Sequence, residues 1–249
     1  MDVKLEGKKV LITGGTRGIG RAIAVAFAEA GADLVINFAS NQDAASETYS
    51  LLSKYGRFIR MIKGDASNPE FGADLVQQGI DSLGHIDILV NNAGVSHNTP
   101  FLMLEPEEWK RAVDVNVNTL FSITQPVLKH MISKKIAGRV LNLTSLCGVR
   151  PVAAVPVHYA ATKAAITGFT YTLAKEVGRY GITVNAIAPG LIETAFSVNL
   201  PETRKEDFNR FCPLGRIGKP EEVAHLAVFM VSDLNSYMTG ETVIVSGGL

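Results

Sequence analysis

The sequence has little cysteine, no excess of charge and no long apolar run. Its 249 residues include two cysteines, Cys147 and Cys212, which are too few for a disulfide framework. We expect both to fill apolar space in a reducing compartment, and we predict no metal site. Lys plus Arg and Asp plus Glu number 24 each, so no global field favours nucleic acid or an anionic membrane.

No run approaches the roughly 18 to 20 apolar residues of a membrane span. The N-terminus, MDVKLEGKKVLITGG, passes directly into a predicted strand and has no apolar signal-peptide core. We therefore expect a cytoplasmic protein with neither a membrane nor a nucleic acid as partner.

Short β-branched runs alternate with longer helical stretches along the chain. This alternation, with 47% hydrophobic residues, predicts an α/β fold: one domain over 1–249 with a doubly wound, seven-stranded parallel sheet and helices on both faces. The predicted strands are 9–13, 34–37, 58–62, 86–90, 140–143, 183–187 and 242–245, and the predicted helices are 18–30, 42–55, 69–83, 107–133, 159–180 and 220–231.

Glycine and proline punctuate these segments. Gly31, Gly56, Gly84 and Gly181 each stand between a helix and the next strand, where a left-handed C-terminal cap is needed. Pro126 falls inside the helix predicted for 107–133. Because proline removes a helical hydrogen bond, we expect a kink or a break there.

A glycine-rich turn, TGGTRGIG, links the first predicted strand to the first helix. Gly14, Gly18 and Gly20 have the spacing G-x-x-x-G-x-G. An ordinary tight turn would also use glycines. However, a strand before the turn and a helix after it are typical of a loop that binds a dinucleotide pyrophosphate at a helix N-terminus.

A second stretch, 145–163, carries groups able to deliver a proton to a carbonyl oxygen. Tyr159 and Lys163 are four residues apart, so on a helix they share a face, and the ammonium would lower the pKa of the phenol. Tyr171 and Lys175 repeat the spacing. Twelve residues at about 100° each turn this second pair roughly 120° away, so we assign it to packing or a subunit contact.

These motifs together resemble the short-chain dehydrogenase/reductase family, and the resemblance covers essentially the whole chain. The matching segments are TGGTRGIG (13–20), NNAG (91–94), DVNVN around Asn116, Ser145, the Tyr159 and Lys163 pair, and Pro189 and Gly190 followed by Thr194. The resemblance implies a Rossmann-type fold and an NADP-dependent oxidoreductase. It also implies a catalytic set of Asn116, Ser145, Tyr159 and Lys163.

In this interpretation Tyr159 is the general acid, Lys163 lowers its pKa and holds the nicotinamide ribose, and Ser145 stabilises charge on the substrate oxygen. Asn116 would anchor a water that links Lys163 to solvent. Taken singly, these residues are equally compatible with a capping serine, a surface Tyr–Lys pair and a helix-kinking asparagine.

The predicted cofactor contacts extend over the whole edge of the sheet. They are Gly14, Thr16, Arg17, Gly18, Ile19, Gly20, Ser40, Asp65, Ala66, Asn92, Ala93, Gly94, Tyr159, Lys163, Pro189, Gly190, Ile192 and Thr194. Asp65 resembles the acid of the family that contacts adenine; capping the helix that starts after Asn68 is its alternative role.

The end of the second strand indicates which dinucleotide is used. An NAD enzyme usually presents a carboxylate there, but this end reads Asn37-Phe38-Ala39-Ser40. Asp33 stands at the other end of the strand. Arg17, unless it is only a solvated loop charge, would meet a 2′-phosphate, with Ser40 and Asn41 as further donors. We predict NADPH.

Within the family the chain is most similar to 3-oxoacyl-[acyl-carrier-protein] reductases, through TRGIG, NFASN and PLGRIGKPEEVA (213–224). It departs from them in a longer loop before Tyr159 and in His158, where asparagine is common. The resemblance implies a homotetramer. An acidic carrier would need a basic surface near the site, for which the candidates are Lys129, Lys134, Lys135, Arg139 and Arg179.

A segment at about 191–212 is the predicted substrate lid. Phe196 and Leu200 in it, with Val155 and Val157 before the catalytic tyrosine, suggest an apolar pocket. Other reductases of the family act on free ketones, steroids, polyols or natural-product intermediates, so these remain alternative substrates. A cofactor-binding regulator without turnover is the alternative from a different class.

Overall fold

A computed structural model describes residues 3–153, 155–198 and 202–249. Seven parallel strands form one sheet in the order β3-β2-β1-β4-β5-β6-β7. The strands are β1 (Lys9–Thr13), β2 (Asp33–Phe38), β3 (Ile59–Lys63), β4 (Ile88–Asn91), β5 (Arg139–Leu143), β6 (Thr183–Pro189) and β7 (Thr242–Val245). The predicted fold class is confirmed, and each predicted strand lies within about two residues of an observed one.

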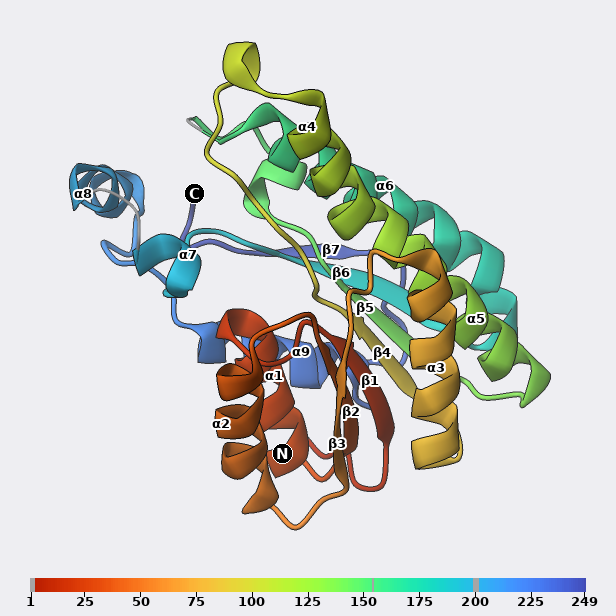
Figure 1. Cartoon of the computed structure of the whole chain (residues 1–249). Coiled ribbons are helices and arrows are strands. Elements are labelled where there is room, and N and C mark those ends of the chain that lie inside the picture. The colour runs from red at the N-terminus through yellow and green to blue at the C-terminus, as the bar shows by residue number, and fades with distance from the viewer. Residues whose placement is uncertain (1–2, 154, 199–201) are drawn as a thin grey trace.

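Helices cover both faces of the sheet (Figure 1). They are α1 (Gly18–Glu29), α2 (Gln42–Ser53), α3 (Pro69–Leu83), α4 (Pro106–Val113), α5 (Thr119–Ser133), α6 (Val157–Val177), α7 (Ala195–Val198), α8 (Glu202–Phe211) and α9 (Pro220–Val231). In the described part of the chain none of them is long and apolar enough to cross a membrane.

Two apolar cores flank the sheet. On one face Ile23 and Phe27 of α1 pack with Val223 and Val228 of α9. On the other face Leu75 of α3, Ile123 of α5 and Ala174 of α6 belong to the second core. Because both faces are covered, the central strands are continuous apolar runs, which is why their pattern was legible in the sequence.

The glycine punctuation is confirmed, but the break predicted at Pro126 is wrong. Gly31, Gly56, Gly84 and Gly181 all have positive φ, from 66° to 104°. Helix α5 continues through Pro126. The interruption lies earlier, in a π-helical segment at Asp114–Asn118 that separates α4 from α5 and contains Asn116. Pro126 is in the middle of α5, where proline removes one backbone hydrogen bond without ending the helix, whereas the π turn widens the backbone.

Candidate active site

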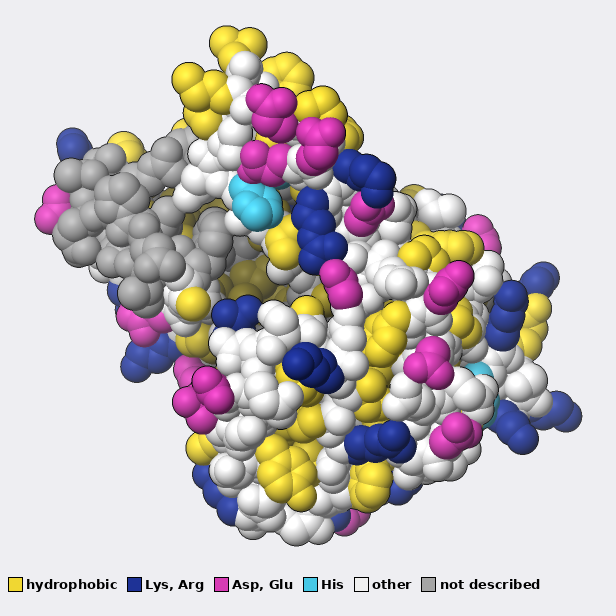
Figure 2. All heavy atoms as spheres, in the orientation of Figure 1, with side chains coloured by type: hydrophobic (Ala, Val, Ile, Leu, Met, Phe, Trp, Pro, Cys, Tyr) yellow, Lys and Arg dark blue, Asp and Glu magenta, His cyan; other side chains and the backbone are white. Residues whose placement is uncertain are grey.

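The carboxyl ends of β1, β4, β5 and β6 meet at one edge of the sheet, and the predicted site residues follow those ends. Figure 2 shows this face of the molecule hollowed between the part that carries α4 and the part that carries α1 and α2. Parallel α/β sheets bind ligands at this edge, where the loops diverge.

The glycine loop is compact because two of its residues have no space for a side chain. Gly14 and Gly18 have φ of 64° and 51°. A Cβ on Gly20 would lie 2.4 Å from the carbonyl oxygen of Gly14, and a Cβ on Gly15 would lie 2.7 Å from Ile36. The first turn of α1 therefore approaches β1 closely. The backbone N–H groups of this turn have no partner within the helix and are available to a ligand at the carboxyl ends of the strands.

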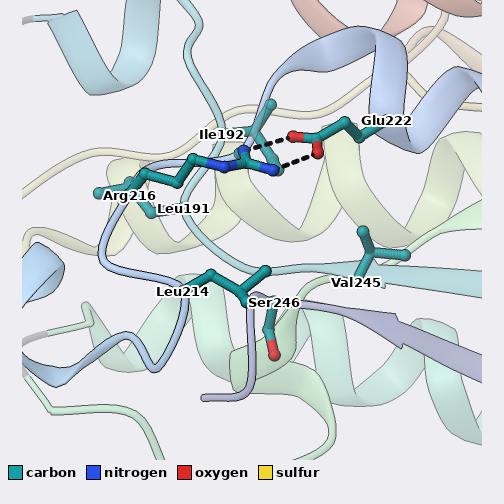
Figure 3. Close-up of a pocket in the computed structure, with 9 residues that line it drawn as sticks. Leu191, Ile192, Leu214, Arg216, Glu222, Val245 and Ser246 are labelled. Carbon is teal, nitrogen blue, oxygen red and sulfur yellow. Dashed lines mark hydrogen bonds and ion pairs between the residues drawn. The ribbon is translucent and has the colours of Figure 1, made fainter.

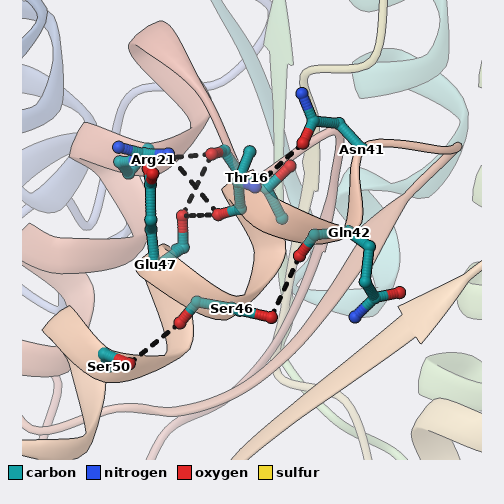
Figure 4. Close-up of polar contacts among 9 residues, drawn as sticks. Thr16, Arg21, Asn41, Gln42, Ser46, Glu47 and Ser50 are labelled. Atoms are coloured by element: carbon teal, nitrogen blue, oxygen red, sulfur yellow. Dashed lines mark hydrogen bonds and ion pairs between the residues drawn. The ribbon is translucent and has the colours of Figure 1, made fainter.

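Side chains of α1 and α2 hold this loop (Figure 4); Arg21 lies on α1, and Glu47 and Thr48 lie on α2. The Arg21 Nε donates to the carbonyl oxygen of Thr16 at 2.9 Å, and Thr48 Oγ1 donates to the same oxygen at 3.0 Å. Arg21 also pairs with Glu47 at 3.2 Å. The carbonyl oxygen of Thr16 is thus fixed toward α1 and α2. We therefore expect the neighbouring backbone N–H groups to point away from these helices.

The NNAG segment ties β1, β4 and β5 together. Asn92 Nδ2 donates to the carbonyl oxygens of Thr13 and Gly14, at 3.1 and 2.8 Å. Asn91 Nδ2 donates to Asn142 Oδ1 at 2.9 Å, and Asn142 Nδ2 donates to Thr170 Oγ1 at 2.9 Å. This buried network links the sheet to the part of α6 beyond Lys163.

We expect Gly20→Ala to weaken dinucleotide binding at least tenfold. The added methyl group meets backbone oxygen and has nowhere to go, so it displaces the loop and costs about 1–3 kcal/mol of stability. Fluorescence titration with NADPH and thermal unfolding measure the two effects. Gly168→Ala is the matched control: its Cβ meets nothing within 4 Å, so it should keep binding and raise stability by up to about 1 kcal/mol. Unchanged binding in Gly20→Ala would contradict this geometry.

Three predicted catalytic residues lie beside one another. Ser145 precedes a 3₁₀ turn at Leu146–Gly148, which packs directly on α6 near Lys163. Lys163 is 4% exposed; its ammonium donates to the carbonyl oxygen of Leu143 at 2.8 Å and lies 5.6 Å from the centre of the Tyr159 ring. The Ser145 hydroxyl is close enough to the Tyr159 phenol to act on its pKa, in the lowering direction.

Asn116 reaches the same place from the π-helical segment. Its side chain accepts from Val95 N at 2.8 Å and donates to Thr162 Oγ1 at 2.9 Å. A Cβ on Gly94 would lie 3.3 Å from Asn116 Oδ1 and 3.5 Å from the Lys163 ammonium. The structure therefore brings NNAG, Asn116 and Lys163 together, while their catalytic roles stay predictions.

The ionisation of this pair differs from the expectation. Burial raises the pKa of Tyr159 above its usual value, and the nearby Cys147 raises it further. Burial lowers the pKa of Lys163 from 10.5 to about 8. The predicted net lowering of the phenol pKa is therefore wrong for this arrangement: desolvation outweighs any effect of the Lys163 charge, whose ammonium donates to Leu143.

The second Tyr–Lys pair is separate from the site, as predicted. The Lys175 ammonium donates to the Tyr171 hydroxyl at 2.7 Å, and Tyr171 is 56% exposed. Helix phase places this pair on the solvent side of α6, whereas Lys163 is on its buried side.

The segment after β6 reaches the glycine loop. A Cβ on Gly18 would lie 3.1 Å from Thr194 Cγ2, and a Cβ on Gly190 would lie 2.9 Å from Ser246. The two ends of the predicted lid are joined by backbone bonds, since Gly218 N donates to the carbonyl oxygen of Leu191 at 3.0 Å. The predicted pocket contributions of Phe196 and Leu200 lie outside the described residues and side chains.

A small cavity of about 90 Å³ lies at the base of this segment (Figure 3). Leu191, Ile192, Leu214 and Val245 line it, and Arg216 closes it through a bidentate ion pair with Glu222, at 2.6 and 2.8 Å. None of the predicted catalytic residues lines it. We interpret it as a packing gap under the segment rather than as the reaction site.

The residues predicted to bind the adenosine half of the dinucleotide lie near the carboxyl ends of β1, β2 and β3. Arg17 is exposed, and its side chain makes no hydrogen bond or ion pair with any residue in the described ranges. Asp33 is engaged elsewhere, with Lys9 at 2.5 Å. Asp65 pairs with Arg111 at 3.0 Å and accepts from Ser67, while Asn68 caps α3, so the alternative role of Asp65 as that cap is wrong.

The proposed basic docking surface is at the wrong edge of the sheet. Lys134 and Lys135 follow the end of α5, and Arg139 begins β5 at its amino end. Five residues of strand, about 17 Å, separate that end from the carboxyl end that leads to Ser145. Arg179 likewise precedes the amino end of β6.

Sequence reasoning missed several supporting residues. Arg111 pairs with Asp65 at the surface, whereas the buried side chains of Asn142 and Thr144 bond to Asn91 and to the Lys163 carbonyl. The one signal in the sequence was polar residues at the ends of otherwise apolar strands. Their partners come from distant helices, so that signal could not name them.

Comparison with known proteins agrees with this geometry. The family described as Enoyl-(Acyl carrier protein) reductase matches residues 14–249. The chain is 39% identical over 249 residues to the 3-oxoacyl-[acyl-carrier-protein] reductase FabG of Aquifex aeolicus, covering 100% of both chains. It is 37% identical over 246 residues to an L-rhamnose 1-dehydrogenase (NADP(+)) of Thermoplasma acidophilum, covering 98% of this chain and 96% of the other.

Among solved structures, a short chain dehydrogenase from Burkholderia cenocepacia in complex with NADP superposes with a TM-score of 0.92. It is 30% identical and the match covers 98% of both chains. Sequence identity of 39% to a relative over the whole chain, and a fold shared with a solved member at 30% identity, show the family. The chain therefore belongs to the short-chain dehydrogenase/reductase family and is an oxidoreductase that binds a nicotinamide dinucleotide.

Proposed function

We propose that the protein reduces a carbonyl group to a secondary alcohol with NADPH, acting on a 3-oxoacyl thioester carried by an acyl-carrier protein. The observation that supports the chemistry is the meeting of Ser145, Tyr159 and Lys163 beside a glycine loop at one sheet edge. The observation that supports NADPH is the unpaired Arg17 beside a strand end that has no carboxylate.

The residues present fit a dinucleotide. Gly14, Gly20 and Gly94 form a cradle in which added side chains would meet backbone or polar atoms. Arg17 and Ser40 are exposed and would meet a 2′-phosphate, and Asp65, Ala66, Pro189, Gly190 and Ile192 complete the predicted contacts. When bound, the reduced nicotinamide supplies a hydride for carbonyl reduction.

Arg17→Ala should lower the affinity for NADPH by about ten- to a hundredfold and leave that for NADH within about twofold. A guanidinium that binds a phosphate contributes charge-assisted hydrogen bonds, and NADH lacks that phosphate. Fluorescence titration of both cofactors with wild type and variant measures the ratio, with NADH as the internal control. Equal losses for both cofactors, or a wild type that prefers NADH, would contradict the assignment.

In the proposed mechanism Tyr159 donates the proton. Its raised pKa keeps the phenol protonated at neutral pH, which is the form needed for reduction. The Ser145 hydroxyl binds the carbonyl oxygen and stabilises the charge that develops on it. Protonated Lys163 stabilises the phenolate that forms when Tyr159 gives up its proton. Asn116, in the π-helical segment, would anchor a water that links Lys163 to solvent, so that the proton is replaced.

The relatives support the thioester and also the main alternative. One matches as a 3-oxoacyl-[acyl-carrier-protein] reductase at 39% identity, and another as an L-rhamnose 1-dehydrogenase at 37%. His158 lies buried before Tyr159, and its ring nitrogens have no hydrogen-bond partner among the described residues. This departure from the reductases keeps free ketones, steroids and polyols as the second candidate class.

An NADPH-oxidation screen tests the proposal. It compares a 3-oxoacyl group on an acyl-carrier protein, the same group on a short thiol, and untethered ketones and sugars. We expect kcat/KM for the carrier-bound thioester to exceed that for untethered ketones by at least tenfold. A reversed order would transfer the assignment to the free-ketone class. Absence of turnover with every carbonyl would instead support a cofactor-binding regulator.

We also propose a homotetramer. Phe121 on α5 and Tyr171 on α6 are 59% and 56% exposed, although the opposite faces of these helices are buried. Strand β7 is at the edge of the sheet and its four residues are only partly buried. Pairing of α4, α5 and α6 between subunits, and packing of β7 at a second interface, would cover these surfaces. Light scattering after size exclusion measures the mass.

A further inference from the structure

Thr144, the residue before Ser145, has no role in the proposed mechanism. It is 4% exposed, and its hydroxyl donates to the main-chain carbonyl oxygen of Lys163 at 2.7 Å. The hydroxyl also lies 3.2 Å from Thr167 Oγ1, which itself donates to the Lys163 carbonyl at 3.2 Å. Two threonines therefore converge on one carbonyl of α6.

The contact is reciprocal. While Thr144 binds the main chain of Lys163, the ammonium of Lys163 donates to the main-chain carbonyl oxygen of Leu143, the residue before Thr144, at 2.8 Å. The end of β5 thus holds Lys163 both at its backbone and at its charged tip.

The 3₁₀ turn at Leu146–Gly148 packs tightly against this contact. A Cβ on Gly148 would lie 2.6 Å from the Lys163 carbonyl oxygen and 2.7 Å from Thr144 Oγ1. The 3₁₀ turn is therefore closed against the Thr144 bond. Ser145 immediately precedes that turn, and Tyr159 lies one helical turn before Lys163 on α6. The Thr144 hydroxyl therefore joins the two elements that carry the site residues.

We propose that Thr144 is a positioning residue for Lys163: its hydroxyl fixes α6 to the end of β5 and so sets the spacing among Ser145, Tyr159 and Lys163. This inference rests on the proposed reductase function. Misplacing a reacting group by about 1 Å can cost on the order of a hundredfold in rate. A smaller relaxation, of the kind one lost hydrogen bond allows, should cost about tenfold.

Thr144→Val tests the proposal, because valine keeps the shape and removes the hydroxyl. We expect kcat for carbonyl reduction to fall about tenfold, with NADPH affinity by fluorescence within about twofold. Thr144→Ser restores the hydroxyl and should return kcat to within about threefold of wild type. A serine variant as slow as the valine variant would overturn the proposal, since packing alone would then explain both.

Thr170→Val is the matched control. Thr170 is also buried on α6 and accepts a 2.9 Å bond from Asn142 of β5, but it lies seven residues beyond Lys163. It should lose thermal stability to a similar degree and keep its kcat. If both valine variants lose kcat in proportion to their loss of stability, Thr144 is only structural and the proposal fails.

A readout without turnover separates this proposal from the proposed function. The groups that act electrostatically among the site residues are Tyr159 and Lys163 on α6 and Cys147 in the turn. The pH dependence of unfolding from pH 7 to 10 reports the Lys163 pKa. Thr144→Val should move it upward, because water reaches the loosened ammonium, and Thr170→Val should not. An unmoved Lys163 pKa would count against the proposal even if no carbonyl proved to be a substrate.

Discussion

Tyr159→Phe should abolish carbonyl reduction, with kcat lower by at least about a thousandfold, while NADPH affinity stays within about twofold. The phenol is the only group of the proposed set that is both protonated at neutral pH and placed beside Ser145 to donate. General acid catalysis contributes about 10² to 10⁴ in rate. Phenylalanine keeps the ring and removes the hydroxyl proton, so the variant should lose the chemical step while it still binds NADPH. Stopped-flow absorbance at the nicotinamide band measures the chemical step, and fluorescence measures binding.

Tyr171→Phe is the matched control. It removes an equivalent hydroxyl from the same helix and breaks an equivalent pair, with Lys175, on the exposed side. This variant should keep wild-type kcat. Turnover retained by Tyr159→Phe would refute the assignment of the acid, and loss of turnover in Tyr171→Phe would show that helix phase had been applied to the wrong pair.

Lys163→Met should remove activity and stabilise the fold. A pKa that falls from 10.5 to about 8 means that burial disfavours the charged amine by about 3 kcal/mol. Methionine fills similar space without charge. Because the bond to Leu143 is lost as well, we expect the unfolding free energy at pH 7 to rise by about 1–2 kcal/mol. The rate should fall at least about a hundredfold, since nothing then favours the phenolate.

The sign of the pH dependence follows from the lowered pKa. Below pH 8 the Lys163 amine is charged in both the folded and the unfolded protein, so desolvation of the buried charge destabilises the folded protein in full. Between pH 8 and 10.5 the folded protein loses its proton first, so wild-type stability rises toward that of the variant. Cys147 and Tyr159 titrate in both proteins, so the difference between them isolates Lys163. The gap in unfolding free energy should therefore narrow as the pH rises.

The same ionisation predicts the rate profile. If charged Lys163 is the active form, kcat/KM for reduction is level below about pH 7 and falls tenfold per unit above about 8. Lys175→Met, on the exposed side of α6, is the control and should change neither stability nor profile by much. A Lys163→Met protein that is less stable than wild type at pH 7 would show that the buried ammonium is favourable in place.

Patterns with local causes were readable from the sequence. Glycines at 31, 56, 84 and 181 were correctly placed at helix ends, because left-handed backbone is a property of one residue. Strand boundaries were close because runs buried on both faces need no distant partner to be recognised. The Tyr171 pair was excluded by helix phase alone.

Features that depend on contacts between distant residues were not readable. The helix break fell at Asp114–Asn118 rather than at Pro126. The basic residues before β5 were assigned to the wrong edge, because linear proximity to Ser145 does not tell which end of the strand is near. The phenol pKa was given the wrong direction, since a spacing of four residues conveys proximity but not burial.

By itself, therefore, the sequence determined the doubly wound sheet, the glycine loop, the candidate catalytic residues and the family to which the chain belongs. These depend on residue type, short spacing and order. Only the tertiary structure decided that Lys163 is desolvated, that its ammonium binds Leu143 and that Thr144 holds its backbone. Burial and long-range hydrogen bonds arise only when β5 and α6, separated in the chain, are packed against each other.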